Sequence, residues 1–336
     1  MSRVTARLRQ MLLPELRRAW TRDLDPPLKA LQHEVERLQR ELATLRSAHD
    51  ALALREFTAS RGVYLESLDA LLALEPIQAH IEQAISNAVV ESEPTTHAVI
   101  ENILPPAFYE LVAAAIPPPE LFPSRDPVKQ DFHLDLHLDG APELTRRVWQ
   151  YFDQTVVSGV LVPALLARFR DAVVAHYAES GDETFGQRAA TMSHHGFSGR
   201  LHLRRPGYVL KPHLDPKRVV ITGLFYFPRP GDTEDYGTQL HRVLRPFKSS
   251  VGGKFYPGDH DLPMELAKTV PYRPNSLLAF VNSRAAHSAT LPKDASLLER
   301  YAYQFYVKPL DADLKALLRE LPAADRAQWV GEAAGL

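Results

Sequence analysis

Cysteine is absent from this chain of 336 residues. Its absence excludes disulfides, thiolate metal sites and cysteine nucleophiles, so a metal site would have to use histidine and carboxylate ligands. A chain without cysteine also fits a reducing compartment. We therefore expect a cytoplasmic protein.

The sequence also lacks a long apolar run and a surplus of charge. No stretch of about 18 apolar residues occurs, so we expect no membrane span, and residues 1–20 lack the apolar core of a secretory signal. Lys and Arg number 39 against 41 Asp and Glu, which gives a formal charge of -2. Because binding to nucleic acid needs surplus positive charge, we expect no nucleic-acid partner.

A heptad pattern marks the N-terminal region, which we place at residues 1–96. Between residues 28 and 56, apolar side chains recur in alternating steps of three and four, at Leu28, Leu31, Val35, Leu38, Leu42, Leu45 and Leu52. This pattern predicts a coiled-coil-like helix. It could form a homodimer through residues 28–56, or fold back as a hairpin on a helix predicted at Tyr64–Leu74.

The second domain is predicted at residues 97–336, with helices first and short strands after Gly186. Runs rich in β-branched or aromatic residues predict the strands, at 200–205, 219–227, 238–244, 276–282 and 300–308. Turns separate these runs without intervening helices, which favours antiparallel sheets in a sandwich or jelly roll. We therefore predict an α+β fold, with a helical region before a jelly-roll domain that has supporting helices.

Three His-x-Asp motifs occur, at 133–135, 137–139 and 213–215. Residues two apart on a strand face the same side, so each motif can present an imidazole and a carboxylate together. The first two motifs alternate with apolar residues between 132 and 138, which is typical of a structural strand with one wet face. We therefore choose His213 and Asp215, and add His287, expected in a polar turn, to complete a two-histidine, one-carboxylate metal site.

The segment Tyr208-Val-Leu-Lys-Pro-His213-Leu-Asp215, followed by Thr222-Gly-Leu-Phe-Tyr-Phe, resembles the 2-oxoglutarate and iron(II)-dependent oxygenases, in their prolyl-hydroxylase-like branch. Two further segments resemble the same family, in the family's order: Tyr236-Gly-Thr-Gln-Leu and Pro274-Asn-Ser-Leu-Leu-Ala-Phe, the second leading to His287. The resemblance covers residues 191–308.

The resemblance implies a double-stranded β-helix that uses Fe(II), 2-oxoglutarate and O2, releases succinate and CO2, and hydroxylates a small molecule or a peptide side chain. His213, Asp215 and His287 would hold the iron, and Arg300 would bind the distal carboxylate of 2-oxoglutarate; the alternative for Arg300 is a surface ion pair. Further candidates for the co-substrate site are Tyr208, Thr222 and Gln304. Retention of Asp215 argues against a halogenase.

Two other functions remain open. The chain could be an inactive or differently metallated jelly-roll protein that recruits partners through its coiled coil. It could also be a zinc hydrolase, although that leaves Arg300 unexplained. The turn-rich segment 246–271 could close over a substrate or be a surface insertion.

Overall fold

The computed structural model describes residues 3–247, 252–296 and 299–330, and the chain divides into two units, Met1–Glu56 and Phe57–Leu336. The first unit belongs to the long helix α1 (Arg3–Glu66). The predicted heptad residues lie on α1 and are exposed, with Leu38 at 50% and Leu42 at 48%. The hairpin alternative is wrong, because the chain would have to reverse before Tyr64 whereas α1 continues to Glu66.

The second unit begins 40 residues before our predicted boundary, at Phe57 instead of His97. Helix α3 (Leu74–Asn87) explains the difference, because its Ile77, Ile81 and Ile85 are buried in the main core of this unit. Apolar residues at spacing four place one stripe of the helix against the core. Residues 57–96 therefore pack with the strand-rich domain.

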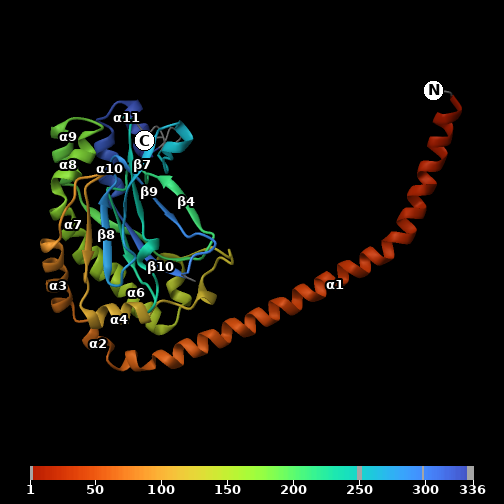
Figure 1. Ribbon diagram of the computed structural model, residues 1–336, viewed down its shortest axis with the longest axis horizontal. Coiled ribbons are helices and arrows are strands. Elements are labelled where there is room, and N and C mark those ends of the chain that lie inside the picture. The colour runs from red at the N-terminus through yellow and green to blue at the C-terminus, as the bar shows by residue number, and fades with distance from the viewer. Residues whose placement is uncertain (1–2, 248–251, 297–298, 331–336) are drawn as a thin grey trace. The chain divides into compact units, whose positions relative to one another are not determined.

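The core of the second unit contains two antiparallel sheets (Figure 1). The first has the order β1 (His97–Glu101), β8 (Ser276–Val281), β5 (Ile221–Tyr226), β10 (Arg300–Pro309), β3 (His194–Arg204) and β2 (Lys129–His133). The second has the order β4 (Val209–His213), β9 (Ala285–Thr290), β6 (Gln239–Val243) and β7 (Met264–Thr269). From β3 to β10 the chain passes repeatedly from one sheet to the other. This strand order is that of a jelly roll, consistent with the predicted double-stranded β-helix.

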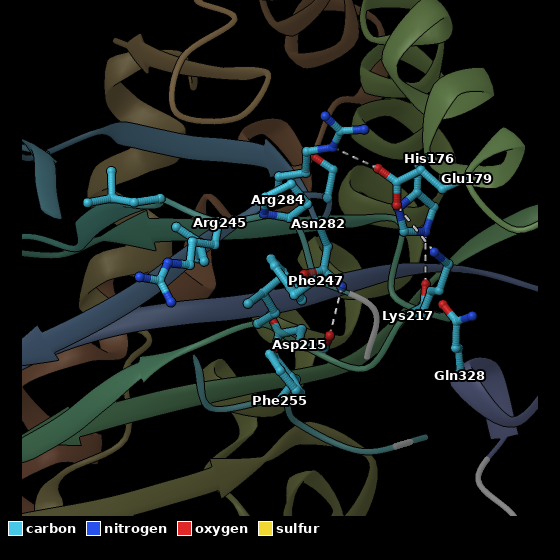
Figure 2. Close-up of a pocket in the computed structure, with 15 residues that line it drawn as sticks. His176, Glu179, Asp215, Lys217, Arg245, Phe247, Phe255, Asn282, Arg284 and Gln328 are labelled. Atoms are coloured by element: carbon cyan, nitrogen blue, oxygen red, sulfur yellow. Dashed lines mark hydrogen bonds and ion pairs between the residues drawn. The ribbon is translucent and has the colours of Figure 1, made fainter. Parts of the chain in front are cut away.

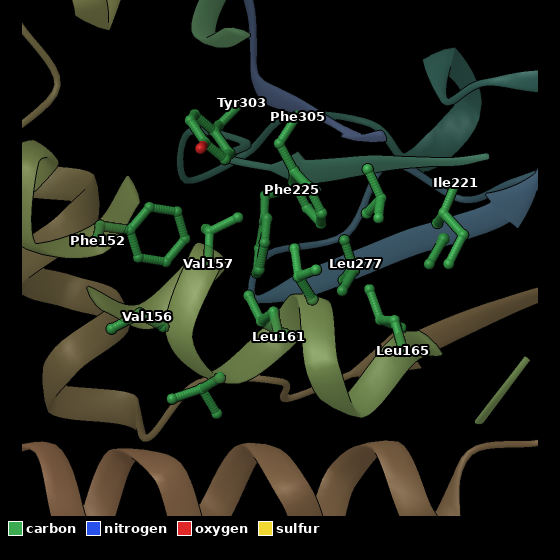
Figure 3. Packing of buried hydrophobic residues seen from close by; sticks show 14 of the residues in the cluster. Phe152, Val156, Val157, Leu161, Leu165, Ile221, Phe225, Leu277, Tyr303 and Phe305 are labelled. Atoms are coloured by element: carbon green, nitrogen blue, oxygen red, sulfur yellow. The ribbon is translucent and has the colours of Figure 1, made fainter. Parts of the chain in front are cut away.

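Helices cover the outer face of the six-stranded sheet. They are α2 (Leu68–Leu71), α3, α4 (Pro106–Ala114), α5 (Leu134–His137), α6 (Glu143–Tyr151), the π-helix η3 (Phe152–Leu161), α7 (Val162–Arg168), α8 (Arg170–Ala178), α9 (Glu183–Ala190), α10 (Asp311–Leu318) and α11 (Ala323–Val330). Figure 3 shows side chains of η3 and α7 packed against Phe225 of β5 and Phe305 of β10. No helix in the described part of the chain is long and apolar enough to cross a membrane.

Alternation along β5 decides which side chains face the inside of the jelly roll. Ile221 and Phe225 join the cluster under the helices, whereas Leu224 and Tyr226 join a separate cluster between the two sheets. Thr222 lies on the same face as Leu224, because residues two apart share a face. Apolar clusters therefore pack on both faces of β5, and Thr222 lies on the face between the two sheets.

Two local predictions are wrong. The strand predicted across residues 132–138 ends at His133, because Leu134–His137 forms α5. The segment 246–271 is not wholly a loop, since β7 pairs with β6 over its last part. At β7, pairing with β6 overrides the local turn pattern.

Candidate metal centre

His213, Asp215 and His287 come together inside the jelly roll. His213 ends β4, and His287 is its direct partner across the β4–β9 ladder. The Nε2 atom of His213 lies 3.8 Å from Oδ1 of Asp215, and Nε2 of His287 lies 3.6 Å from Oδ2. All three side chains are buried, and their ligand atoms lie within 4.8 Å of one another. Two imidazoles and one carboxylate in this spacing can hold a metal ion and leave other coordination positions open.

The predicted position of His287 was wrong in one respect. It does not lie in a polar turn but within β9, where Ala285–Ser288 are buried. The sequence Ala-Ala-His-Ser-Ala-Thr has little of the β-branched character that predicts a strand. Pairing with β4 and β6 stabilises this strand although its residues have low β-propensity.

Both imidazoles are prepared to act as neutral ligands. Nδ1 of His213 donates to the carbonyl of Lys211 at 2.9 Å, which leaves Nε2 with its lone pair facing Asp215. Burial lowers the pKa of His213 and lowers that of His287 to about 3. At neutral pH both rings are therefore uncharged, as metal binding requires.

Three side chains orient Asp215. Its carboxylate accepts hydrogen bonds from the hydroxyls of Thr222 (2.8 Å) and Tyr306 (3.1 Å), and the amide of Asn282 donates to its backbone carbonyl at 2.9 Å. Burial opposes ionisation of Asp215, but the neighbouring His287, His213 and Lys254 outweigh it and hold its pKa below the usual value. The carboxylate is therefore charged and fixed in direction.

Thr222 has a different partner from the one we expected. We placed its hydroxyl in the co-substrate site, but its proton is donated to Asp215. A hydroxyl has one proton to donate. Thr222 is therefore assigned to positioning the carboxylate.

Arg300 is buried, so the surface ion-pair interpretation is wrong. Its Nε donates to the carbonyl of Tyr236 at 2.6 Å, and its guanidinium lies 5.3 Å from the ring centroids of Tyr226 and Tyr272. Its Nη2 is buried and has no hydrogen-bond partner among the described residues. A buried guanidinium with an unused donor is suited to bind an anion, since an unmet charge is costly in the interior.

A cavity of about 290 Å³ joins Arg300 to the metal centre. The predicted co-substrate residues Tyr208 and Gln304 line it together with His213 and His287. Gln304 faces the cavity with Arg300, as the period of two along β10 predicts. Its Oε1 accepts a hydrogen bond from Arg200 at 3.0 Å.

Several residues that line this cavity were not predicted from the sequence. Lys254 places its Nζ 3.0 Å from Nε2 of His213, the atom that a metal would take. Its neighbour Phe255 pairs with Leu214 through two backbone hydrogen bonds, so this part of segment 246–271 is anchored beside the metal centre. Arg200 and His202 also line the cavity, and their alternation with buried Leu201 and Leu203 is a signal that could have found them.

A second cavity, of about 570 Å³, is lined in part by Asp215 (Figure 2). Phe247 and Phe255 form an apolar part of its wall, and Glu179 forms an ion pair with Arg284 at 3.5 Å. His176 also lines it, where Nε2 donates to the carbonyl of Lys217 at 2.9 Å. No residue in the described ranges lines both cavities, so the metal centre forms part of the wall that separates them.

Comparisons with known proteins give structural neighbours only. Neither family models nor curated proteins match the sequence. A prolyl-4-hydroxylase from Pseudomonas putida has 14% identity and a TM-score of 0.36, and the match covers 70% of this chain and 100% of that one. A prolyl hydroxylase from Trichoplax adhaerens, in complex with a peptide fragment of hypoxia inducible factor, has 16% identity and a TM-score of 0.39, with coverage of 75% and 95%.

A third neighbour is HygX from Streptomyces hygroscopicus, crystallised with nickel, 2-oxoglutarate and hygromycin B. It has 14% identity and a TM-score of 0.39, and the match covers 64% of this chain and 83% of that one. These neighbours belong to the family that the motifs resemble. At such scores the likeness itself carries no argument about activity, so the function has to be argued from the residues of this chain.

Proposed function

We propose that the protein is an Fe(II)- and 2-oxoglutarate-dependent oxygenase that hydroxylates its substrate. The observation that carries the proposal is that one cavity contains both His213 and His287 of the metal centre and the unused donor of Arg300. A metal ligand set and a buried guanidinium are what a co-substrate with two carboxylates would need. The family resemblance of the motifs supports the same assignment.

In the proposed reaction, the residues of this chain bind and orient the metal and the co-substrate. His213, Asp215 and His287 would hold Fe(II), and Arg300 would pair with the distal carboxylate of 2-oxoglutarate. Tyr208 lies at the cavity wall, with its ring 4.8 Å from the guanidinium of Arg204. The bound iron and co-substrate would supply the O2-dependent oxidation of a C–H bond, with release of succinate and CO2.

Burial of the three ligands would limit the access of water to a bound metal. Thr222 and Tyr306 hold both oxygens of Asp215, so this carboxylate stays in one orientation. The buried ligand set, in which hydrogen bonds orient His213 and Asp215, favours a metal enzyme over an inactive scaffold. A zinc hydrolase would leave the free donor of Arg300 without a role.

Calorimetric titration of 2-oxoglutarate into the protein, with and without Mn(II), tests the proposal. Mn(II) occupies oxygen- and nitrogen-ligand sites and keeps the titration free of oxidation. We expect one 2-oxoglutarate per chain, bound tightly only when the metal is present. A protein that binds one metal but no 2-oxoglutarate would contradict the proposal and favour the hydrolase.

A further inference from the structure

The cavity at the metal centre contains more positive charge than the proposed co-substrate would neutralise. Five cationic side chains line it, Lys129, Arg200, Arg204, Lys254 and Arg300. Among the described lining residues, Asp131 is the carboxylate that faces them. Arg204 and Arg300 are buried, whereas Arg200 and Lys254 are half-buried and Lys129 is exposed. Positive charge gathered around one cavity attracts an anionic ligand.

The strand register places four of these cations, all except Lys254, in rows on the inner face of the sheet. Lys129 of β2 lies opposite Arg204 of β3, which lies opposite Arg300 of β10. Four residues along each strand from the Arg204–Arg300 pair, Arg200 lies opposite Gln304. The rows extend from the co-substrate anchor towards the exposed side chain of Lys129 at the edge of the sheet.

Two of these positive charges already have a counterpart. Arg204 donates to Asp131 at 2.6 Å, and Arg300 is assigned to the distal carboxylate of 2-oxoglutarate. The charge of Fe(II) would be balanced by Asp215 and the second carboxylate of the co-substrate. Lys254 lies close enough to Asp215 to interact with its charge, and Lys129 acts in the same way on the exposed carboxylate of Asp126. Among the described residues, Arg200 donates only to neutral groups.

The partners of Arg200 are neutral. It donates to Oε1 of Gln304 at 3.0 Å and to the hydroxyl of Tyr306 at 3.2 Å. The same hydroxyl donates to Asp215 at 3.1 Å, so Arg200 is two hydrogen bonds from a metal ligand. The side chain of Lys129 is exposed, and its charge helps to lower the pKa of the nearby Asp126 carboxyl.

We propose that the substrate is a small organic acid whose carboxylate or phosphate group is bound by Arg200, with the exposed Lys129 adding positive charge at the edge of the sheet. The inference rests on the proposed function and assigns the substrate class to the same site. The position of Arg200 beside Tyr306 would hold the substrate with its reacting carbon near the metal. A cavity of about 290 Å³ that also takes 2-oxoglutarate suits a small molecule and not a polyanionic chain.

The test uses the full chain loaded with Mn(II) and 2-oxoglutarate. Inorganic phosphate and acetate are titrated separately by calorimetry, with chloride keeping the ionic strength constant. The anion that binds more tightly identifies the preferred anionic group of the substrate. We expect Arg200→Gln and Lys129→Gln each to weaken binding of that anion by about tenfold, because each removes a charged donor. Arg319→Gln, at an exposed position outside the cavity, is the matched control and should bind as the wild type does.

The two variants should keep the affinity for 2-oxoglutarate, since Arg300 is unchanged. Anion affinity that is equal in the wild type, Arg200→Gln and Lys129→Gln would overturn the inference, as would an anion that merely displaces 2-oxoglutarate. Failure of the metal-loaded wild type to bind 2-oxoglutarate would instead contradict the proposed function. A subsequent screen of acids against their neutral amides, read as succinate release, should show stimulation by the acids alone.

Discussion

At the scale of single residues, the metal ligands could be predicted from the sequence but their supporting partners could not. His213 and Asp215 share a face because of their spacing, and the family motif identifies His287. Thr222 reaches Asp215 from β5 and Tyr306 reaches it from β10. No local pattern relates residues 7 and 91 positions apart, so only the folded chain shows that they orient the same carboxylate.

The hydroxyl of Thr222 should matter for metal binding although it is not a ligand. Thr222→Val keeps the shape and removes the hydrogen bond to Asp215, so we expect the metal affinity to fall by about 10- to 100-fold. Competition with a metal-binding dye measures it. Thr269→Val, at an exposed position on β7, is the control. Equal metal affinity in the two variants would refute the positioning role of Thr222.

Arg300 should determine the affinity for 2-oxoglutarate without affecting the metal. We expect Arg300→Gln to weaken co-substrate binding by about 100-fold, and Arg300→Lys to restore only part of it, because an ammonium lacks the planar pair of donors. Calorimetry with Mn(II)-loaded protein measures both. Arg284→Gln, whose side chain is 82% exposed, is the control. The role is wrong if Arg300→Gln binds 2-oxoglutarate as tightly as this control does.

At the scale of elements, strands with strong β-propensity were predicted and those stabilised mainly by pairing were missed. Strands β5 and β8 consist of buried apolar runs, whereas β9 reads as a polar turn. The reverse error occurred at Leu134–His137, where alternation predicted a strand and a helical turn forms. Alternation describes exposure, and a short amphipathic helix can produce it over a few residues.

We propose that α1 mediates a homodimer through residues 28–56. Its seam residues are exposed over several turns, and a coiled-coil partner would bury them. Light scattering should give a dimer for the wild type and a monomer for a variant carrying Leu38→Asp and Leu42→Asp. Thr44→Asp, outside the seam, should stay dimeric. A monomeric wild type at micromolar concentration would contradict this proposal.

At the scale of the whole molecule, the α+β class with antiparallel sheets was predicted, but the division of the chain was not. A polar segment at Glu91–Thr96 suggested a boundary there. The structure instead places Ile77, Ile81 and Ile85 in the core of the second unit. A polar linker in the sequence does not show whether the helix before it packs against the domain after it.

Two truncations distinguish these boundaries. Removal of residues 1–56 should leave a folded unit that binds metal, with a melting temperature close to that of the full chain. Removal of residues 1–96 deletes three buried isoleucines, each worth about 2–5 kcal/mol, and should abolish folding or lower the melting temperature severely. Calorimetric melting measures both. Equal stability of the two truncated proteins would contradict the observed division.

The most direct measurement of the central claim is an anaerobic titration of Fe(II) and then 2-oxoglutarate, followed by visible absorption. The account predicts a weak charge-transfer band with the wild type, from 2-oxoglutarate bound to the metal, and no band with His213→Ala. A wild type that binds one Fe(II) and gives no band would contradict the assignment of this site to a 2-oxoglutarate-dependent oxygenase.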